Sequence, residues 1–357
     1  MRRFVYFFAI VLLAAPGLHA GVEEEWAYIV SLDAGPQKKP TTPDEVALIA
    51  RNHLLVQQKA IEQFLARNPG DPRAFDARLR LARILAAEGK MGKNPGQVDE
   101  ALKILGDLEK SSGVPRAKLA DAGFARASLS MQNQKDEGPQ AREAIVWAAQ
   151  NFTAKYPGDR RGPRLIVEAA TVCDDVPFQK RDLLEEALRL TDEEPLKRRI
   201  ADDLRRLDLL GKPLVLKMSS VSGGPIDLAK LRGNVVVLIF WSADSPHSLL
   251  WLRDFRSSWE TFPKEHLRVV TVSLDEERAT FSSRFHELRA DWPTHFDGLG
   301  WRGPVARGLG INAVPTIWLL DKKGILRSIN AKSSYETWIN RLLEEEPLAA
   351  SETKNSD

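Results

Sequence analysis

The chain has 357 residues, and at about 150 residues per domain this length predicts two domains, each long enough to bury its own core. Hydrophobic residues make up 43% and charged residues 28%, which is ordinary for a folded globular protein and excludes collagen-like and low-complexity classes. The formal net charge is +2, and Arg2 and Arg3 supply it, so the rest of the chain is neutral and gives no electrostatic reason to expect nucleic acid or an anionic membrane as a partner.

Cys173 is the single cysteine of the chain. One thiol allows no internal disulfide, no Cys-x-x-Cys pair and no multi-cysteine zinc site. The histidines never stand at metal-ligand spacing from another histidine or from the cysteine, so we expect no metal and no cofactor. The run 298–303 has the letters of the dinucleotide motif G-x-G-x-x-G, but Pro304 follows it and no βαβ unit opens on it, which argues against nucleotide binding.

Residues 1–20 have the order of a secretory signal: a basic start, the apolar run 4–15, and a small residue, Ala20, at the end. The run is too short for a comfortable membrane span, and no cysteine follows it for lipid attachment. We therefore expect cleavage after residue 20, export to the periplasm or cell envelope, and no stable membrane span in the mature chain. An uncleaved N-terminal anchor is the alternative.

Residues 21–42 read as a linker or N-terminal extension, and apolar residues recur at helical spacing from 43 to 210. Within that part the segments 64–73 and 152–161 match, each with Phe, Ala, Pro-Gly-Asp and Arg at the same offsets. This pattern resembles degenerate tetratricopeptide-type repeats, without the full signature of that family, and predicts stacked helix pairs. Such pairs usually form a concave binding surface, although a packed helical appendage without a ligand is also consistent with the pattern.

After Gly211-Lys212-Pro213 the pattern changes to strands alternating with helices. The continuous apolar run 235–240 is typical of a strand buried on both faces, and 267–274 is a second such strand. A hairpin is expected across 317–329 and an amphipathic helix over 335–345. We predict a mixed α/β domain over 211–347 and a disordered polar tail over 348–357.

Three motifs of this half carry a resemblance, in order: 226–233, 240–248 and 310–316. The segment 240–248, Phe-Trp-Ser-Ala-Asp-Ser-Pro-His-Ser, resembles the Phe-Trp-x-x-x-Cys-x-x-Cys active segment of thioredoxin-fold proteins. With its flanking motifs it resembles the TlpA/ResA-like branch and its AhpC/TSA (redoxin) relatives. The resemblance covers about 213–346 and implies a thioredoxin-like α/β/α sandwich after the helical domain.

Both cysteine positions of that family are serine here, Ser245 and Ser248. The family chemistry needs a thiolate that attacks a disulfide and a second thiol that resolves it, and a serine hydroxyl can do neither. Asp244, Ser245 and His247 are the residue types of a catalytic triad, but neighbours at a helix start point in different directions. We expect Asp244 to be the helix N-cap and Ser248 to be an exposed first-turn residue. Likewise, Asp275 and the two glutamates after it are expected to be a solvated helix start.

The resemblance implies a peptide-binding surface that needs no thiol. In thioredoxin-like proteins the proline matching Pro315 is cis, and the backbone before it, here Val314, pairs with an extended substrate peptide. The residues expected at this surface are Trp241, Pro246, His247, Val314, Pro315 and Thr316.

The leading hypothesis is an exported pseudoenzyme that is redox-inactive at 245–248 and binds a protein or an extended peptide through this groove and the helical repeats. The alternative is a thiol-disulfide oxidoreductase or peroxidase that acts through Cys173 or through a partner's cysteine. A lone cysteine at the end of a helical run is most often a small buried hydrophobe. The sequence leaves the partner, the pathway and the oligomeric state open.

Overall fold

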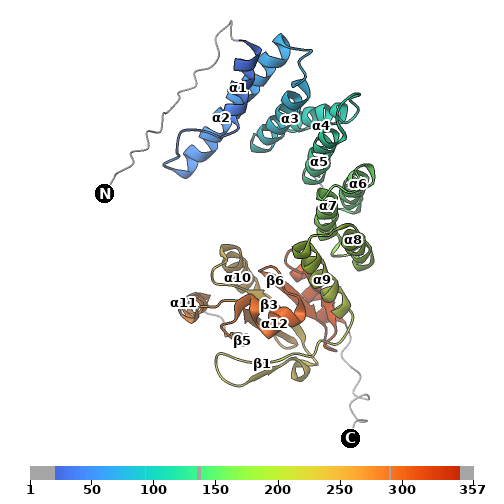
Figure 1. Cartoon of the computed structure of the whole chain (residues 1–357). Coiled ribbons are helices and arrows are strands. Elements are labelled where there is room, and N and C mark those ends of the chain that lie inside the picture. Colours follow the sequence, from blue (N-terminus) through green and yellow to red (C-terminus); the bar gives the residue numbers. More distant parts are fainter. Residues whose placement is uncertain (1–20, 93, 135–137, 289–290, 346–357) are drawn as a thin grey trace, which may run out of the picture. The chain divides into compact units, whose positions relative to one another are not determined.

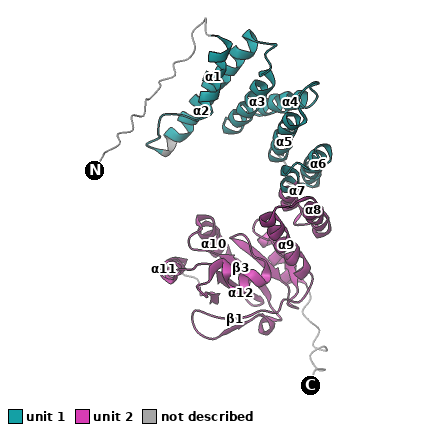
Figure 2. Cartoon of the chain, in the orientation of Figure 1, with its two compact units in different colours: residues 1–165 teal, residues 166–357 magenta. Residues whose placement is uncertain are grey.

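In the computed structural model, the described residues are 21–92, 94–134, 138–288 and 291–345. The predicted signal 1–20 and the predicted tail 348–357 lie outside them. The chain divides into two compact units, residues 1–165 and 166–357 (Figure 2). Each unit is described by itself.

The first unit is helical throughout its described residues (Figure 1). Its helices are α1 (Val22–Leu32), α2 (Pro43–Arg67), α3 (Ala74–Met91), α4 (Pro95–Leu108), α5 (Arg116–Gln132), α6 (Pro139–Lys155) and the start of α7 (Arg161–Ala170). Helices adjacent in the chain pack against each other, and three of them begin with proline at the first turn, which lacks the N–H that a helix start leaves unpaired.

Helix α1 lies within the segment 21–42 that the sequence pattern assigned to a linker. Val22, Trp26 and Ile29 are spaced to share one face of a helix, and they pack with Ile61 and Phe64 of α2. The part of this segment that forms α1 is therefore packed in the helical core, and residues 33–42 connect it to α2. Two apolar turns are a short signal, which is why the pattern alone did not reveal the helix.

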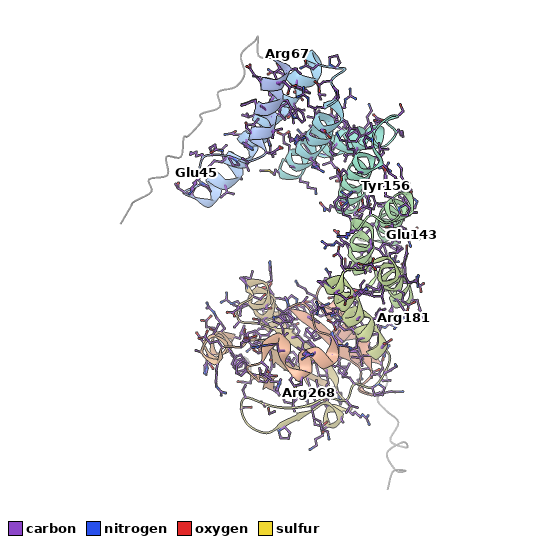
Figure 3. The ribbon with its side chains drawn as sticks, in the orientation of Figure 1. Glu45, Arg67, Glu143, Tyr156, Arg181 and Arg268 are labelled. Carbon is purple, nitrogen blue, oxygen red and sulfur yellow. The ribbon has the colours of Figure 1, made fainter. Side chains whose placement is uncertain are left out.

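The two Pro-Gly-Asp segments fold into the same turn, as the matching letters predict. Asp71 accepts hydrogen bonds from the N–H and the Nε of Arg73, both at 2.8 Å. Asp159 accepts the same two bonds from Arg161, at 3.0 and 2.9 Å. Before the first turn, α2 ends at Arg67. Before the second turn, α6 ends at Lys155, and Tyr156 caps it (Figure 3).

In both copies the arginine of the turn also lies over two aromatic rings. Each guanidinium is 4.8–6.0 Å from the ring centroids, a distance at which the cation and the ring attract each other. The rings are those of Trp26 and Phe64 for Arg73, and of Phe124 and Phe152 for Arg161. The internal repeat is thus a repeated set of contacts as well as repeated letters.

The second unit combines the last helices with a five-stranded sheet in the order β5-β4-β3-β6-β7. The strands are β3 (Val235–Trp241), β4 (Leu267–Ser273), β5 (Thr294–His295), β6 (Thr316–Leu320) and β7 (Leu326–Ser328). β3, β4 and β5 are parallel, and β6 runs antiparallel to β3 and β7. A separate hairpin of β1 (Lys217–Ser219) and β2 (Pro225–Asp227) precedes the sheet.

Helices cover the central strand, as its unbroken apolar sequence predicts. All seven residues of β3 are buried. Its odd-numbered residues share one core cluster with residues of α10, α11 and α13. On the other face, Phe240 meets Trp318 edge to face. The helices of this unit are α8 (Pro177–Leu190), α9 (Glu194–Leu209), α10 (Pro246–Trp259), α11 (Arg278–Leu288), α12 (Pro304–Leu309) and α13 (Tyr335–Glu344).

The expected fold class is confirmed: a helical N-terminal region is followed by a thioredoxin-like α/β domain. Helix α9 ends at Leu209, next to the predicted domain boundary at 210/211. The compact units nevertheless divide inside α7, so α8 and α9 group with the sheet. The contacts of α9 described below give the physical reason.

Candidate functional site

The predicted site residues gather at one edge of the sheet. The register places Trp241, the last residue of β3, opposite Ser273, the last of β4. It also places Phe240 opposite Thr316, the first residue of β6. The turn from β3 to α10, the residues after β4 and the loop before β6 therefore meet at the same edge.

Ser245 is the N-cap of α10. Its backbone is extended, and its side-chain oxygen accepts a hydrogen bond from the N–H of Ser248 at 3.2 Å. The expectation that Asp244 caps this helix was wrong, because Pro246 starts the helix and the cap is the residue directly before it. The Ser245 hydroxyl oxygen thus performs a structural task that serine performs well.

Ser248 is fully buried, which corrects the expectation of an exposed first-turn residue. It lies in the first turn of α10, as expected, but its Oγ is turned inward and accepts a hydrogen bond from the N–H of Ser242 at 3.5 Å. Among the described residues no hydrogen bond joins Ser245, His247 and Asp244 to one another. The structure therefore assembles no serine-histidine-aspartate relay here.

Asp275 is the residue that fixes the β3–α10 turn. It is 2% exposed and accepts hydrogen bonds from Ser242 Oγ at 2.7 Å, from the N–H of Ala243 at 2.8 Å and from Ser273 Oγ at 2.6 Å. The prediction of a solvated helix start at this position was wrong, since α11 begins only at Arg278. An acid two residues after a largely buried strand is the signal that could have revealed it.

Trp241 does not contribute to the surface. Its side chain is 1% exposed and packs in the core, with its ring 5.9 Å from that of Phe281. This corrects its assignment to the peptide-binding set, because a residue at the end of a strand covered on both faces is enclosed. Pro246 and His247 are exposed at the edge, as a binding surface requires.

The Val314–Pro315 peptide bond is cis, as the resemblance implies. Pro315 is buried, while Val314 and Thr316 are partly exposed. Thr316 Oγ1 donates a hydrogen bond to the carbonyl of Ala313 at 2.7 Å, which closes the loop on itself. No residue that the structure describes forms a hydrogen bond with the main chain of Val314, so its N–H and C=O are open to another strand.

Helix α9 holds the loop that leads to Val314, a role that sequence reasoning missed. Asn312 Nδ2 donates a hydrogen bond to Asp203 Oδ1 at 3.1 Å, and Arg206 donates to the carbonyl of Gly310 while pairing with Asp203. Asp203 is buried although it is charged. Because these contacts link positions about a hundred residues apart, no local pattern could predict them.

At Gly310 the backbone of the loop comes close to the backbone of this helix. Its φ is 69°, in the left-handed region, and a Cβ there would lie 2.7 Å from the carbonyl oxygen of Asp202. Only glycine satisfies both conditions without a shift of the backbone. The helix before the sheet is thus built into the framework of the site.

Cys173 lies in a short 3-10 turn, η1 (Thr171–Cys173), and is completely buried. Its Sγ is 3.6 Å from the carbonyl oxygen of Ala169. A thiol without solvent access cannot attack a disulfide or a peroxide. The alternative of redox chemistry through Cys173 therefore finds no support in its surroundings.

No group of three or more histidine, cysteine, aspartate or glutamate side chains among the described residues could hold a metal ion. Within the same residues, no helix is both long and apolar enough to cross a membrane.

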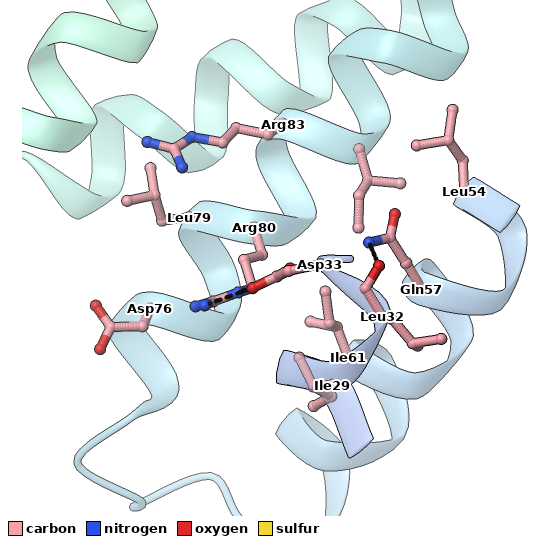
Figure 4. A pocket seen from close by; sticks show the side chains of 11 residues that line it. Ile29, Leu32, Asp33, Leu54, Gln57, Ile61, Asp76, Leu79, Arg80 and Arg83 are labelled. Atoms are coloured by element: carbon pink, nitrogen blue, oxygen red, sulfur yellow. Dashed lines mark hydrogen bonds and ion pairs between the residues drawn. The ribbon is translucent and has the colours of Figure 1, made fainter. Parts of the chain in front are cut away.

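The helical unit contains a pocket of about 350 Å³ between α1, α2 and α3 (Figure 4). Its apolar wall is formed by Ile29, Leu32, Leu54, Ile61, Leu79 and Ile84. Two polar contacts cross it: Arg80 pairs with Asp33 at 2.9 Å, and Gln57 donates to the carbonyl of Leu32 at 3.0 Å. These polar groups are satisfied within the protein.

Residues 212–329 match the model of the AhpC/TSA family. With the sheet order and the cis-proline loop, this match identifies the C-terminal part as a thioredoxin-like redoxin domain. The match begins after α9 and does not include the helical region.

Among known proteins, the chain is 26% identical over 112 residues to sporulation thiol-disulfide oxidoreductase A of Bacillus subtilis, covering 31% of this chain and 67% of that protein. A solved thioredoxin domain of a thiol-disulfide oxidoreductase from Bacteroides vulgatus is 17% identical with a TM-score of 0.34, covering 37% of this chain and 97% of that one. The structure of StoA from Bacillus subtilis is 23% identical with a TM-score of 0.29, covering 33% and 87%.

Proposed function

We propose that this chain is an exported thioredoxin-fold protein that has no thiol-disulfide activity of its own and binds a protein partner in extended conformation at the Val314–Thr316 edge. The observation that carries the proposal is the open main chain of Val314 beside an α10 start at which both cysteine positions are serine. In this proposal the chain retains the loop around the cis proline for binding and lacks the two cysteines for redox chemistry.

The chemistry of the site supports the proposed absence of redox activity. Thiol-disulfide exchange needs a thiolate on the protein, and the hydroxyl of Ser245 accepts a hydrogen bond as a helix cap while Ser248 is buried. Neither oxygen can form a bond that a second residue then resolves. The single thiol of the chain, Cys173, is enclosed.

The binding role is supported by main-chain geometry. A partner strand that pairs with Val314 needs one N–H and one C=O in an extended loop, and it needs shallow side-chain surfaces next to them. Pro246 and His247 are exposed at the same edge and provide such a surface. The loop is held by α9 and Asp203, so it is ordered before a partner arrives, which reduces the entropy cost of binding.

Export is supported by the signal-like order of residues 1–20. Determination of the N-terminal residue of the protein recovered from the cell envelope tests this part, with Gly21 expected. An intact Met1 on the recovered protein would contradict cleavage.

The binding proposal is tested by restoring the thiols. In a Cys173→Ala background, the S245C/S248C variant is compared with the unaltered serines in an assay of insulin reduction by dithiothreitol. In this assay dithiothreitol reduces the protein disulfide, and the resulting dithiol reduces an insulin disulfide while it is itself oxidised again. We expect the variant to accelerate insulin precipitation at least about tenfold over the parent, which should match the rate with dithiothreitol alone.

The matched control is S257C in the same background, because Ser257 is exposed on α10 away from the helix start. It should not accelerate the reaction. Equal rates for S245C/S248C, S257C and the parent would show that the edge does not bring an extended chain to the restored thiols, and would reject the proposal. Activity of the parent with both serines in place would reject the absence of redox activity.

A further inference from the structure

A second groove in the helical unit lies between the first half of α2 and the end of α3. It has a volume of about 500 Å³. Its rim carries large apolar side chains that are exposed: Leu48, Leu55 and Met91 are 46–58% accessible. Exposed apolar side chains grouped around one cavity are typical of a binding surface, whereas scattered ones need no explanation.

Glu88 lies on the wall of this groove and is 8% exposed. Its Oε2 accepts a hydrogen bond from Gln97 Nε2 at 3.0 Å. Its Oε1 is buried and has no hydrogen-bond partner among the described residues. An unpaired carboxyl oxygen in such a place is costly, because it has lost its water and gained no donor.

The helix around Glu88 is placed by close packing. A Cβ on Gly89 would lie 2.7 Å from Cγ2 of Val98 and 3.0 Å from the carbonyl oxygen of Asn94. The contact between α3 and the start of α4 thus leaves no room for Glu88 to move away toward α4. Arg51 is on the rim of the groove and is exposed, and no hydrogen bond joins it to Glu88.

The neighbouring pocket of Figure 4 shows the contrast. The two cavities share Leu54, so they are adjacent along α2 and α3. In the first, Asp33 and Gln57 have their partners within the protein, and both contacts are visible as dashed lines (Figure 4). In the second, Glu88 Oε1 has no donor among the described residues.

We infer that the groove around Glu88 binds an amphipathic helix of a partner protein, with a lysine or arginine placed within its apolar stripe. The apolar stripe would cover Leu48, Leu55 and Met91, and the cation would donate to Glu88 Oε1. The inference goes beyond the function proposed above, because it concerns a separate surface in the other unit.

The ionisation of Glu88 gives the interaction a dependence on pH. Burial raises the pKa of this carboxyl, and the facing groups act as follows: Gln97 and Arg51 lower it, while Glu62 raises it. The lysine or arginine of the partner favours the ionised carboxylate, so the pKa of Glu88 falls when the partner binds. Binding therefore releases protons, and affinity rises with pH until Glu88 is ionised in the free protein as well.

The test uses labelled helical peptides of about 18 residues, a length at which isolated helices form measurably. Three peptides share the same leucine stripe and differ at one central position, which is lysine, norleucine or glutamate. Fluorescence anisotropy with the full chain measures each dissociation constant. We expect the lysine peptide to bind about tenfold or more tightly than the norleucine peptide, and the glutamate peptide to bind most weakly.

Glu88→Gln should remove most of the preference for lysine and leave the norleucine peptide unaffected. Because this change removes a buried charge, the variant is expected to fold, and a thermal melt checks that. Arg51→Gln should tighten the lysine peptide, since it removes a competing cation. Leu55→Ser should weaken all three peptides, whereas Val56→Ser, a neighbouring exposed residue that lines a different pocket, should not.

A lysine preference that persists in Glu88→Gln, a norleucine peptide that binds best, or no binding by any peptide would each overturn the inference. These outcomes leave the cis-proline edge untouched, because the insulin assay tests it separately. If the insulin assay fails while the peptides bind as expected, the helical groove stands and the proposed site at Val314 falls.

Discussion

The segments around Asp71 and Asp159 build the same turn from the same residues, yet they bury different glutamates behind it. In the first copy, Glu25 of α1 is buried and accepts a hydrogen bond from Asn68 Nδ2 at 3.0 Å, next to its ion pair with Arg67. In the second copy the glutamate is the residue that caps the C-terminus of α4 instead. The turn is repeated, but its polar support is not.

Glu109 is the buried acid of the second copy. It accepts hydrogen bonds from Tyr156 Oη and Lys155 Nζ, each at 2.9 Å, and pairs with Arg126 Nε at 2.6 Å. Tyr156 and Lys155 stand where Asn68 and Arg67 stand in the first copy, counted from the turn.

The position that would correspond to Glu25 is occupied by Gly123. The acid two residues before each of them pairs with the arginine of its turn: Glu23 with Arg73, and Asp121 with Arg161. A Cβ on Gly123 would lie 2.5 Å from the ring of Tyr156 and 2.6 Å from Glu109 Oε1. The ring of Tyr156, which caps α6, thus fills the space next to Gly123 of α5. The comparison teaches that in these two copies a buried carboxylate is kept behind the turn although a different helix supplies it.

The largest effect is expected from Glu109→Ala. It leaves three donors without their buried acceptor, and we expect a loss of about 2–3 kcal/mol in the free energy of unfolding, because two of the partners can regain water. Glu25→Ala should cost about 1–2 kcal/mol, since it removes fewer contacts. Urea unfolding followed by circular dichroism measures both. A larger loss for Glu25→Ala would contradict the ranking of the two copies.

Gly123→Ala should cost about 1–2 kcal/mol through the clash with Tyr156, although alanine is normally the better helix former. The matched control is Gly106→Ala in α4, where a Cβ meets nothing closer than Arg126 at 3.8 Å. That variant should be more stable than the parent by up to about 1 kcal/mol. Opposite shifts of the unfolding temperature are the expected result, and a gain in both variants would remove the packing argument.

The smallest change in stability is expected when the pH is lowered from 4 to 2. Hydrogen bonds from Arg73 lower the pKa of Asp71 to about 2. A side-chain hydrogen bond from Arg161 also lowers the pKa of Asp159. A lowered carboxyl pKa gives stability that is present above the ordinary value of about 4 and is lost as the pH falls toward 2. The parent should therefore lose more stability between pH 4 and pH 2 than Asp71→Asn, which cannot titrate there. Parallel losses would show that the turn does not contribute to acid sensitivity.

Local signals in the sequence predicted much of the fold. The apolar run of β3 gave a strand buried on both faces, and the matching letters of 64–73 and 152–161 gave matching turns. The cis bond before Pro315 was expected from the resemblance to thioredoxin-like proteins and is present. In each case the deciding contacts lie within a few residues of one another.

The candidate site was predicted less well, because its residues are placed by distant ones. The Ser248 side chain was expected at the surface, yet it is buried because its face of α10 turns toward the sheet. Asp275 was assigned to solvent, and two of its three partners, Ser242 and Ala243, lie about thirty residues earlier in the chain. The support of the loop by Asp203 spans more than a hundred residues. A single sequence carries no local mark of the contacts of Asp203.

The capping role of Ser245 affects which sequence changes are open to this chain. A hydroxyl at an N-cap contributes about 1 kcal/mol to a helix, so replacing it is opposed by stability before any chemistry is considered. The first cysteine on a path from Ser-x-x-Ser to Cys-x-x-Cys would have no partner thiol at the site and would confer no disulfide. Each single step is therefore a loss or neutral, and only both together could be rewarded. The pair of serines is therefore more easily retained than replaced one residue at a time.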